Sequence, residues 1–104
     1  MNHVFDHIEQ TRYLLSQIFE SGFNSSRDVS AGLAECERLA VELGMSGGGE
    51  LLRDLAGKLN ALSGGQGGME DAAAAYANVV TYYNMVADML IIETMSNKSN
   101  PQAE

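Results

Sequence analysis

The sequence is poor in several residue types that stabilise small proteins or carry out chemistry. Its 104 residues include no tryptophan, one proline, one cysteine and two histidines. Because Cys36 is the single thiol, no intramolecular disulfide can form, and a reducing cytoplasm is the expected location. The apolar residues are mainly Leu, Ala, Met, Ile and Val, and that mixture favours helix over strand.

Positive charge is also scarce. Six lysines and arginines face fourteen acids, for a formal net charge of −8, and no base lies between Lys58 and Lys98. A surface with this much negative charge repels phosphate backbones and anionic lipids. We therefore expect neither nucleic acid nor a membrane as a partner. The acids form no run, which indicates a solubilising surface; a basic protein partner is the alternative.

Long apolar runs are missing as well, and no stretch approaches the roughly 20 residues that cross a membrane. The N-terminal segment is polar and acid-bearing, so no signal peptide is expected. The chain has room for one domain and one modest core. We therefore expect a single cytoplasmic domain over residues 1–95, followed by a polar, disordered tail over residues 96–104.

Glycines divide the chain at three places, namely Gly22, then Gly44 with Gly47–Gly49, and finally Gly64, Gly65, Gly67 and Gly68. We interpret the two glycine clusters as flexible loops between helices. Helical apolar spacing fills the intervals, which predicts helices over about 2–20, 27–43, 49–62 and 69–95. Asn2 and either Ser25 or Ser26 are candidate N-caps, and Gly22 and Gly44 suit the positions that follow a helix end.

Each of the first three predicted helices has one apolar face. The expected core positions are Phe5, Ile8, Leu15, Ile18 and Phe19 in the first, Val29, Leu33, Cys36, Leu39 or Ala40, and Leu43 in the second, and Leu51, Leu52, Leu55, Leu59 and Leu62 in the third. Short connections and the absence of an alternating strand pattern predict an all-α, antiparallel four-helix bundle with long first and fourth helices. An up-down-up-down order is expected first. In the alternative, the second and third helices form a short hairpin clasped by the other two.

The fourth predicted helix has two apolar stripes instead of one. At ~100° per residue, the first contains Tyr76, Val79, Tyr83, Val86 and Leu90, and the second contains Tyr82, Met85, Met89 and Ile92. A helix that is apolar on two sides is central in its fold or packs against another chain. We predict that the second stripe is an interface between copies of the chain; central burial and a groove for a different protein are the alternatives.

No residue constellation indicates catalysis. His3 and His7 share a helix side near Asp6, but no third and fourth metal ligands are evident, so both are read as ordinary, partly exposed histidines. Cys36 lies on an apolar stripe between two glutamates, which indicates a core residue and not a nucleophile. The glycine clusters lack the lysine of a phosphate-binding loop. We therefore expect no enzyme, no metal and no cofactor.

Part of the chain resembles a known kind of helical segment. Between Leu14 and Leu62 the order is a helix containing Cys36-Glu37-Arg38-Leu39-Ala40, a Leu43-Gly44 stop, and Leu51-Leu52-Arg53-Asp54-Leu55. This order is similar to the helical accessory segments found beside SWIM-type zinc-finger proteins in bacteria. The zinc-binding cysteines and histidine of that motif are absent, so no metal function carries over. Small acidic helical export chaperones have a similar composition.

Taken together, these patterns predict a non-catalytic protein-interaction or scaffold module, bacterial and cytoplasmic, that forms a homo-oligomer, expected to be a dimer, through its fourth helix. One alternative is a small-molecule-binding sensor bundle with a pocket lined by Tyr76, Tyr83 and the methionines. Another is an acidic helical chaperone for a protein partner.

Overall fold

The computed structural model describes residues 3–23 and 26–99, with the side chains of all of these except residues 94 and 96–99. It is all-α in that part of the chain, with four helices: α1 (His3–Glu20), α2 (Arg27–Glu42), α3 (Ser46–Ser63) and α4 (Met69–Ser99). The predicted all-α four-helix architecture is confirmed. The first helix is not longer than the third, however, and α4 alone is long.

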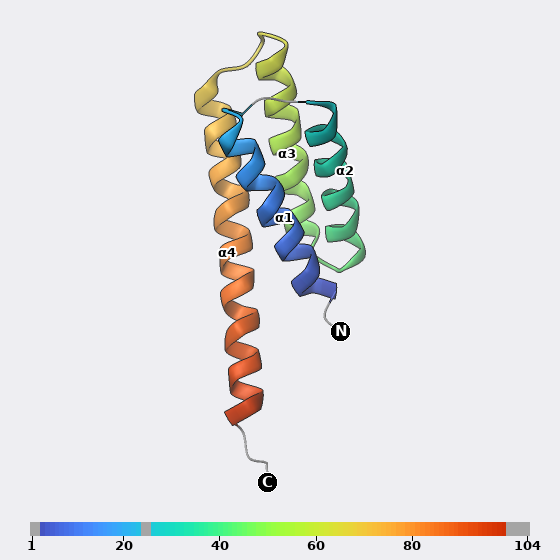
Figure 1. The fold of residues 1–104 in the computed structure, drawn as a ribbon, viewed down its shortest axis with the longest axis vertical. Coiled ribbons are helices and arrows are strands. Elements are labelled where there is room, and N and C mark those ends of the chain that lie inside the picture. The colour runs from blue at the N-terminus through green and yellow to red at the C-terminus, as the bar shows by residue number, and fades with distance from the viewer. Residues whose placement is uncertain (1–2, 24–25, 100–104) are drawn as a thin grey trace.

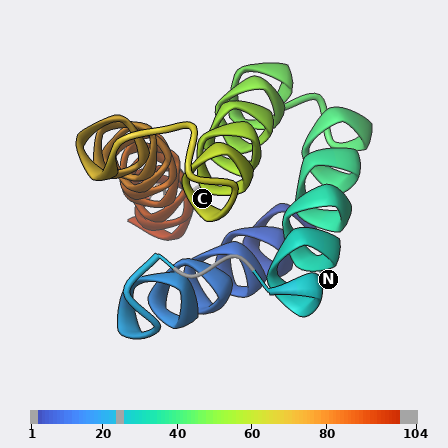
Figure 2. The same ribbon diagram turned by 90° about the horizontal axis from the view of Figure 1, so that it is seen from above.

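The helices run up, down, up and down around a shared core (Figure 1). Viewed from above, they occupy the corners of a square in chain order (Figure 2). Each helix packs on its neighbours in that order, α1 on α2 and α4, and α3 on α2 and α4; the diagonal pairs make no such contact within the described residues. Both α1 and α3 therefore border α4. The molecule is 60 Å long and 22 by 21 Å across.

Glycine ends the first two helices through its freedom to adopt a positive φ. Gly22 and Gly44 have φ values of 73° and 80°. After α2, the Met45 N–H donates to the Ala40 carbonyl at 2.7 Å and the Gly44 N–H donates to the Val41 carbonyl at 3.1 Å. This left-handed cap satisfies carbonyls that the end of a helix leaves unpaired. At the other end of α2, the Ser26 side chain accepts from the Val29 N–H, as predicted, whereas Asn2 lies outside the described residues.

The core is formed by residues from all four helices: Ile8, Leu15, Ile18, Leu33, Cys36, Ala40, Met45, Leu52, Leu55, Leu59, Ala72, Ala75, Val79, Tyr83 and Ala87. Most predicted core positions of α2 and α3 are buried or partly buried. The face of α1 differs from the prediction: Phe5 and Phe19 are exposed, and His7 and Thr11 are buried instead. At 3.6 residues per turn, Thr11 lies on the same face of α1 as Ile8, Leu15 and Ile18. It is therefore buried with them although its side chain is polar.

The glycine cluster before the third helix is not a loop. Gly47–Gly49 form the first turn of α3, which begins at Ser46 and not near residue 49. Here the helix passes close to both neighbours: a Cβ on Gly48 would lie 2.7 Å from Tyr82 Cε2, and one on Gly49 would lie 3.1 Å from Val41 Cγ2. Glycine disfavours helix by about 1 kcal/mol per residue, and the close packing of α3 against α2 and α4 offsets that cost.

The fourth helix continues past the predicted end at Met95 and reaches Ser99. Residues 96–99, expected within the tail, are therefore helical, and residues 100–104 lie outside the described part. In Figure 1, α4 projects well beyond the lower ends of the other three helices. Among its described side chains, the last buried one is Ala87, and Leu90 is partly buried against the core. The residues from 91 to 99 form about two and a half turns of helix that extend past the bundle.

Replacing Gly48 with alanine should destabilise the protein, because the new methyl group would overlap the Tyr82 ring and crowd the Tyr83 hydroxyl, 3.1 Å away. Overpacking of this kind costs about 1–3 kcal/mol. Gly57→Ala is the matched control in the same helix, since a Cβ there meets nothing within 4 Å. It should stabilise the protein by about 0.5–1 kcal/mol. Thermal unfolding followed by circular dichroism measures both; equal midpoints would contradict the close α3–α4 contact.

Candidate interaction surface

Half of the exposed large apolar side chains of the described chain lie on the distal half of α4. Met85, Met89, Ile91, Ile92 and Met95 have exposed fractions of 51, 55, 51, 64 and 63%. We call these five residues the distal surface. A helix exposed to water normally turns one apolar stripe towards its own core and keeps the opposite side polar. The distal surface departs from that rule, because its apolar side chains face away from the bundle or lie beyond its end.

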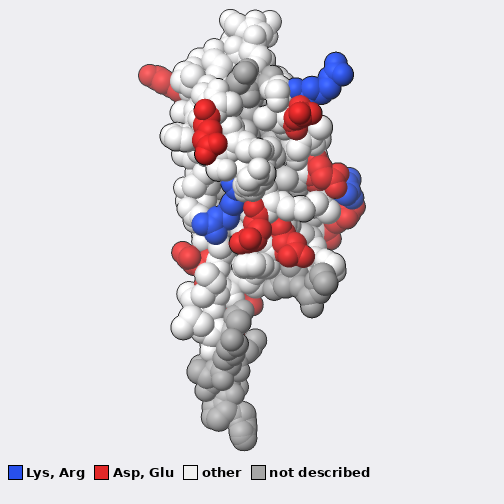
Figure 3. All heavy atoms as spheres, viewed as in Figure 1, with Lys and Arg blue, Asp and Glu red and all other residues white. Residues whose placement is uncertain are grey.

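The apolar residues are spread around the helix. At ~100° per residue, Met85, Met89 and Ile92 lie within one narrow sector, while Met95 lies about a quarter-turn and Ile91 about a third of a turn away. Between residues 85 and 95 the charged residues are Asp88 and Glu93. Figure 3 shows acidic side chains over the bundle, while the described part of the projection is largely uncharged on this face. A helix that is apolar on most sides is normally buried.

The four predicted interface residues differ in their exposure. Met85, Met89 and Ile92 are at least half exposed, in the position that an interface requires. Tyr82 is not part of this surface. It is partly buried against the core and covers the glycines of α3, 3.6 Å from where a Gly47 Cβ would lie. The packing has a steric reason, because glycines without side chains leave room for a tyrosine ring. The role of Tyr82 in an interface stays a prediction.

Ile91 and Met95 were not predicted to belong to the distal surface. The apolar spacing of α4 does not mark these two residues as surface residues. They are exposed because the neighbouring helices have ended at their level. The available signal was the difference in length between the predicted helices, 2–20 and 69–95, which already implied that part of the fourth would lack a neighbour.

A buried polar contact joins α1 to α4 above the distal surface. His7 Nε2 and the Tyr83 hydroxyl are 2.7 Å apart. His7 is 2% exposed, so the expectation of a partly exposed histidine is wrong for His7, although His3 is exposed. His7 Nδ1 and Thr11 Oγ1 are buried without a hydrogen-bond partner in the described chain; Thr11 lies near Cys36 and Tyr83, but neither contact has hydrogen-bond geometry.

Burial shifts the protonation of this cluster towards neutral forms. It lowers the pKa of His7 and raises the pKa of Tyr83 and of the Cys36 thiol, because a charge is poorly solvated in the core. The prediction that Cys36 is a core residue is confirmed. A neutral, buried thiol is a poor nucleophile. The cluster therefore links α1 to α4 in the core through the contact between His7 and Tyr83.

The structure also places the tyrosines that were candidates for a ligand pocket. The Tyr76 hydroxyl donates to the Leu15 carbonyl at 2.9 Å, and Tyr83 is engaged by His7. Both hydroxyl groups thus have partners inside the protein and need no ligand for that purpose. The two tyrosines do border one cleft between α1 and α4, but no methionine lines it.

The comparisons with known proteins add no relative, since the chain matches no protein-family model, no curated protein and no solved structure. None of the helices in the described part is long and apolar enough to cross a membrane. Nor do three His, Cys, Asp or Glu side chains come together as a metal-binding group among the residues that the structure describes.

The buried His7 should make stability fall as the pH falls. Its folded pKa lies below the unfolded value of about 6.5, so the unfolded chain binds more protons as the pH drops through 6.5. The stability present above that pH is then progressively lost. We expect the midpoint of thermal unfolding to decrease between pH 7.5 and pH 5.5. Glu35 titrates below this range, because its hydrogen bond to Arg38 lowers the pKa of its carboxyl group.

His7→Gln should flatten that pH dependence even though it also lowers stability by disturbing the contact with Tyr83. His3→Gln, which changes an exposed histidine one turn earlier, is the matched control and should keep the slope of the parent protein. A His7→Gln protein with an unchanged slope would show that a different group is responsible.

Proposed function

We propose that this protein is a non-catalytic protein-interaction module that self-associates through the distal surface of α4. The observation that carries the proposal is the projection of an apolar helix beyond the bundle, with Met89, Ile92 and Met95 each more than half exposed. Removing apolar area from water yields about 25 cal/mol per Å². A helix of this kind gains most by packing against another apolar helix.

A second copy of the chain is the partner that the charges favour. The segment of α4 that carries the distal surface, residues 85–95, holds no base that would select an acidic partner, and its charged residues are Asp88 and Glu93. Two identical apolar surfaces are complementary to each other when a two-fold axis relates them. An antiparallel pairing of the two projections places the bundles at opposite ends of the pair, which limits the repulsion between two chains that each carry a net charge of −8.

A scaffold role is consistent with this geometry, because two bundles held at the ends of a joined pair of helices would leave their other faces available. The bacterial origin, the cytoplasmic location and the resemblance to accessory segments beside SWIM-type zinc fingers remain part of the proposal, as does the alternative of an acidic chaperone for another protein. The chaperone alternative would use the same distal surface to hold an apolar segment of its client.

Substituting Met89 and Ile92 with glutamate should separate the oligomer into monomers. Each protomer would bring two new charges into the interface, and interface hot spots cost at least about 2 kcal/mol when altered. Because two such residues are changed in each protomer, the dissociation constant should rise at least about 100-fold. Both residues lie beyond the last buried residue of α4, so the bundle and its helical circular dichroism should be preserved. Light scattering across a hundredfold dilution measures the mass.

The matched control is the double substitution Tyr13→Glu and Val41→Glu, which adds the same charge at exposed positions on α1 and α2. It should leave the oligomer intact. A parent protein that is monomeric at every concentration would contradict self-association. An oligomer that survives the two α4 substitutions would show that the interface lies elsewhere.

A further inference from the structure

A cleft of about 270 Å³ lies between α1 and α4, above the level of the distal surface. Its lining residues are Arg12, Leu15, Ser16, Tyr76, Val80, Tyr83 and Asn84. A hydrogen bond lies at each end of the cleft. At one end the Tyr76 hydroxyl donates to the Leu15 carbonyl, and at the other the Tyr83 hydroxyl is hydrogen-bonded to His7. Because the helices are antiparallel, Arg12 lies at a level between the two tyrosines. The walls are thus held in place by contacts that need no ligand.

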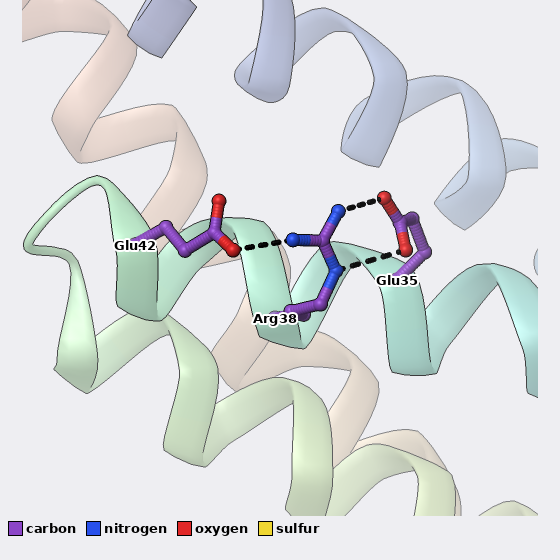
Figure 4. A network of polar contacts seen from close by, with 3 residues as sticks. All are labelled: Glu35, Arg38 and Glu42. Atoms are coloured by element: carbon purple, nitrogen blue, oxygen red, sulfur yellow. Dashed lines mark hydrogen bonds and ion pairs between the residues drawn. The ribbon is translucent and has the colours of Figure 1, made fainter.

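The lining has an unusual charge for this protein. It contains one base and no acid, in a chain in which acids outnumber bases by fourteen to six. Three of the bases are paired with carboxylates. Arg38 lies between Glu35 and Glu42 on α2 (Figure 4), Arg53 pairs with Glu37, and Lys58 pairs with Asp54. Arg12 makes no ion pair with any residue that the structure describes.

The polar atoms left over in the cleft are mainly donors. Ser16 donates its hydroxyl hydrogen to the Tyr13 carbonyl at 2.7 Å, and both tyrosine hydroxyls are engaged. The Arg12 guanidinium and the Asn84 amide form no hydrogen bond to another side chain or backbone group in the described chain. A guanidinium offers five donors and no acceptor, and an amide offers two donors and one acceptor oxygen. A group that accepts hydrogen bonds and carries negative charge complements this pair.

We propose that the cleft binds a small monocarboxylate with a short apolar tail. The carboxylate lies against Arg12 and Asn84, and the tail lies along Leu15, Val80 and the ring of Tyr76. A planar carboxylate can accept two parallel hydrogen bonds from a guanidinium. A phosphate monoester carries a charge of about −1.5 to −2, which a single base in an acidic protein balances less well. The volume is just below the roughly 300–1,000 Å³ of sites for larger ligands.

This site is independent of the self-association proposed above, because none of its lining residues belongs to the distal surface. Titration of the ¹⁵N-labelled protein with hexanoate tests it directly, with hexan-1-ol and hexylamine as probes that share the apolar tail but not the charge. Hexanoate should produce saturable shifts of amide signals around Leu15 and Val80, and none at Gly57 on α3. Hexylamine should produce no saturable shift at these positions, and hexan-1-ol should bind at least about tenfold more weakly.

Arg12→Gln should weaken hexanoate binding at least about tenfold, since hydrogen bonds to charged groups are among the strongest in proteins. Arg27→Gln, which removes an exposed arginine from the start of α2, is the matched control and should bind as the parent does. Raising the salt concentration from 50 to 500 mM should weaken hexanoate binding, because Arg12 is exposed. Equal binding of hexanoate and hexylamine, an unaffected Arg12→Gln protein, or no saturable shift with hexanoate would each overturn the proposal.

Discussion

Burial of the Tyr83 side chain is the constraint on which the arrangement of the four helices depends. The residue is fully buried on α4, its hydroxyl contacts His7 of α1, and it lies near Cys36 of α2. On α3, a Cβ at position 48 would lie 3.1 Å from the Tyr83 hydroxyl and would crowd it, and glycine avoids this contact. An unpaired hydroxyl in a core costs about 1–3 kcal/mol, so the contact with His7 favours one register of α1 against α4, and the steric limit at Gly48 favours one register of α3.

The position of Tyr83 along α4 also decides where the bundle ends. His7 lies about one turn from the start of α1, so the part of α4 that follows Leu90 extends beyond its neighbours. Residues that would be core in a longer bundle are therefore left in water. The distal surface, with Met89 and Ile92 at its centre, is thus a consequence of unequal helix lengths combined with a fixed register.

The cleft and the distal surface use different properties of the same helix. The distal surface is broad, apolar and free of bases, which suits association with a second apolar helix. The cleft is small and combines apolar walls with the guanidinium of Arg12 and the amide of Asn84, which suits a small anion. Since they involve different residues of α4, the proposed ligand site and the proposed self-association surface do not compete for side chains.

The sequence by itself determined the helices and their order: apolar spacing, the Ser26 cap and the stops at Gly22 and Gly44 act over a few residues, so local chemistry specifies them. It also indicated Met85, Met89 and Ile92 as surface residues, although their role as an interface remains a prediction. Only the tertiary structure decided that Tyr82 covers the glycines of α3, that His7 is buried and that Gly47–Gly49 are helical. Each of these depends on which helix lies opposite, and that is settled by packing between residues far apart in the chain.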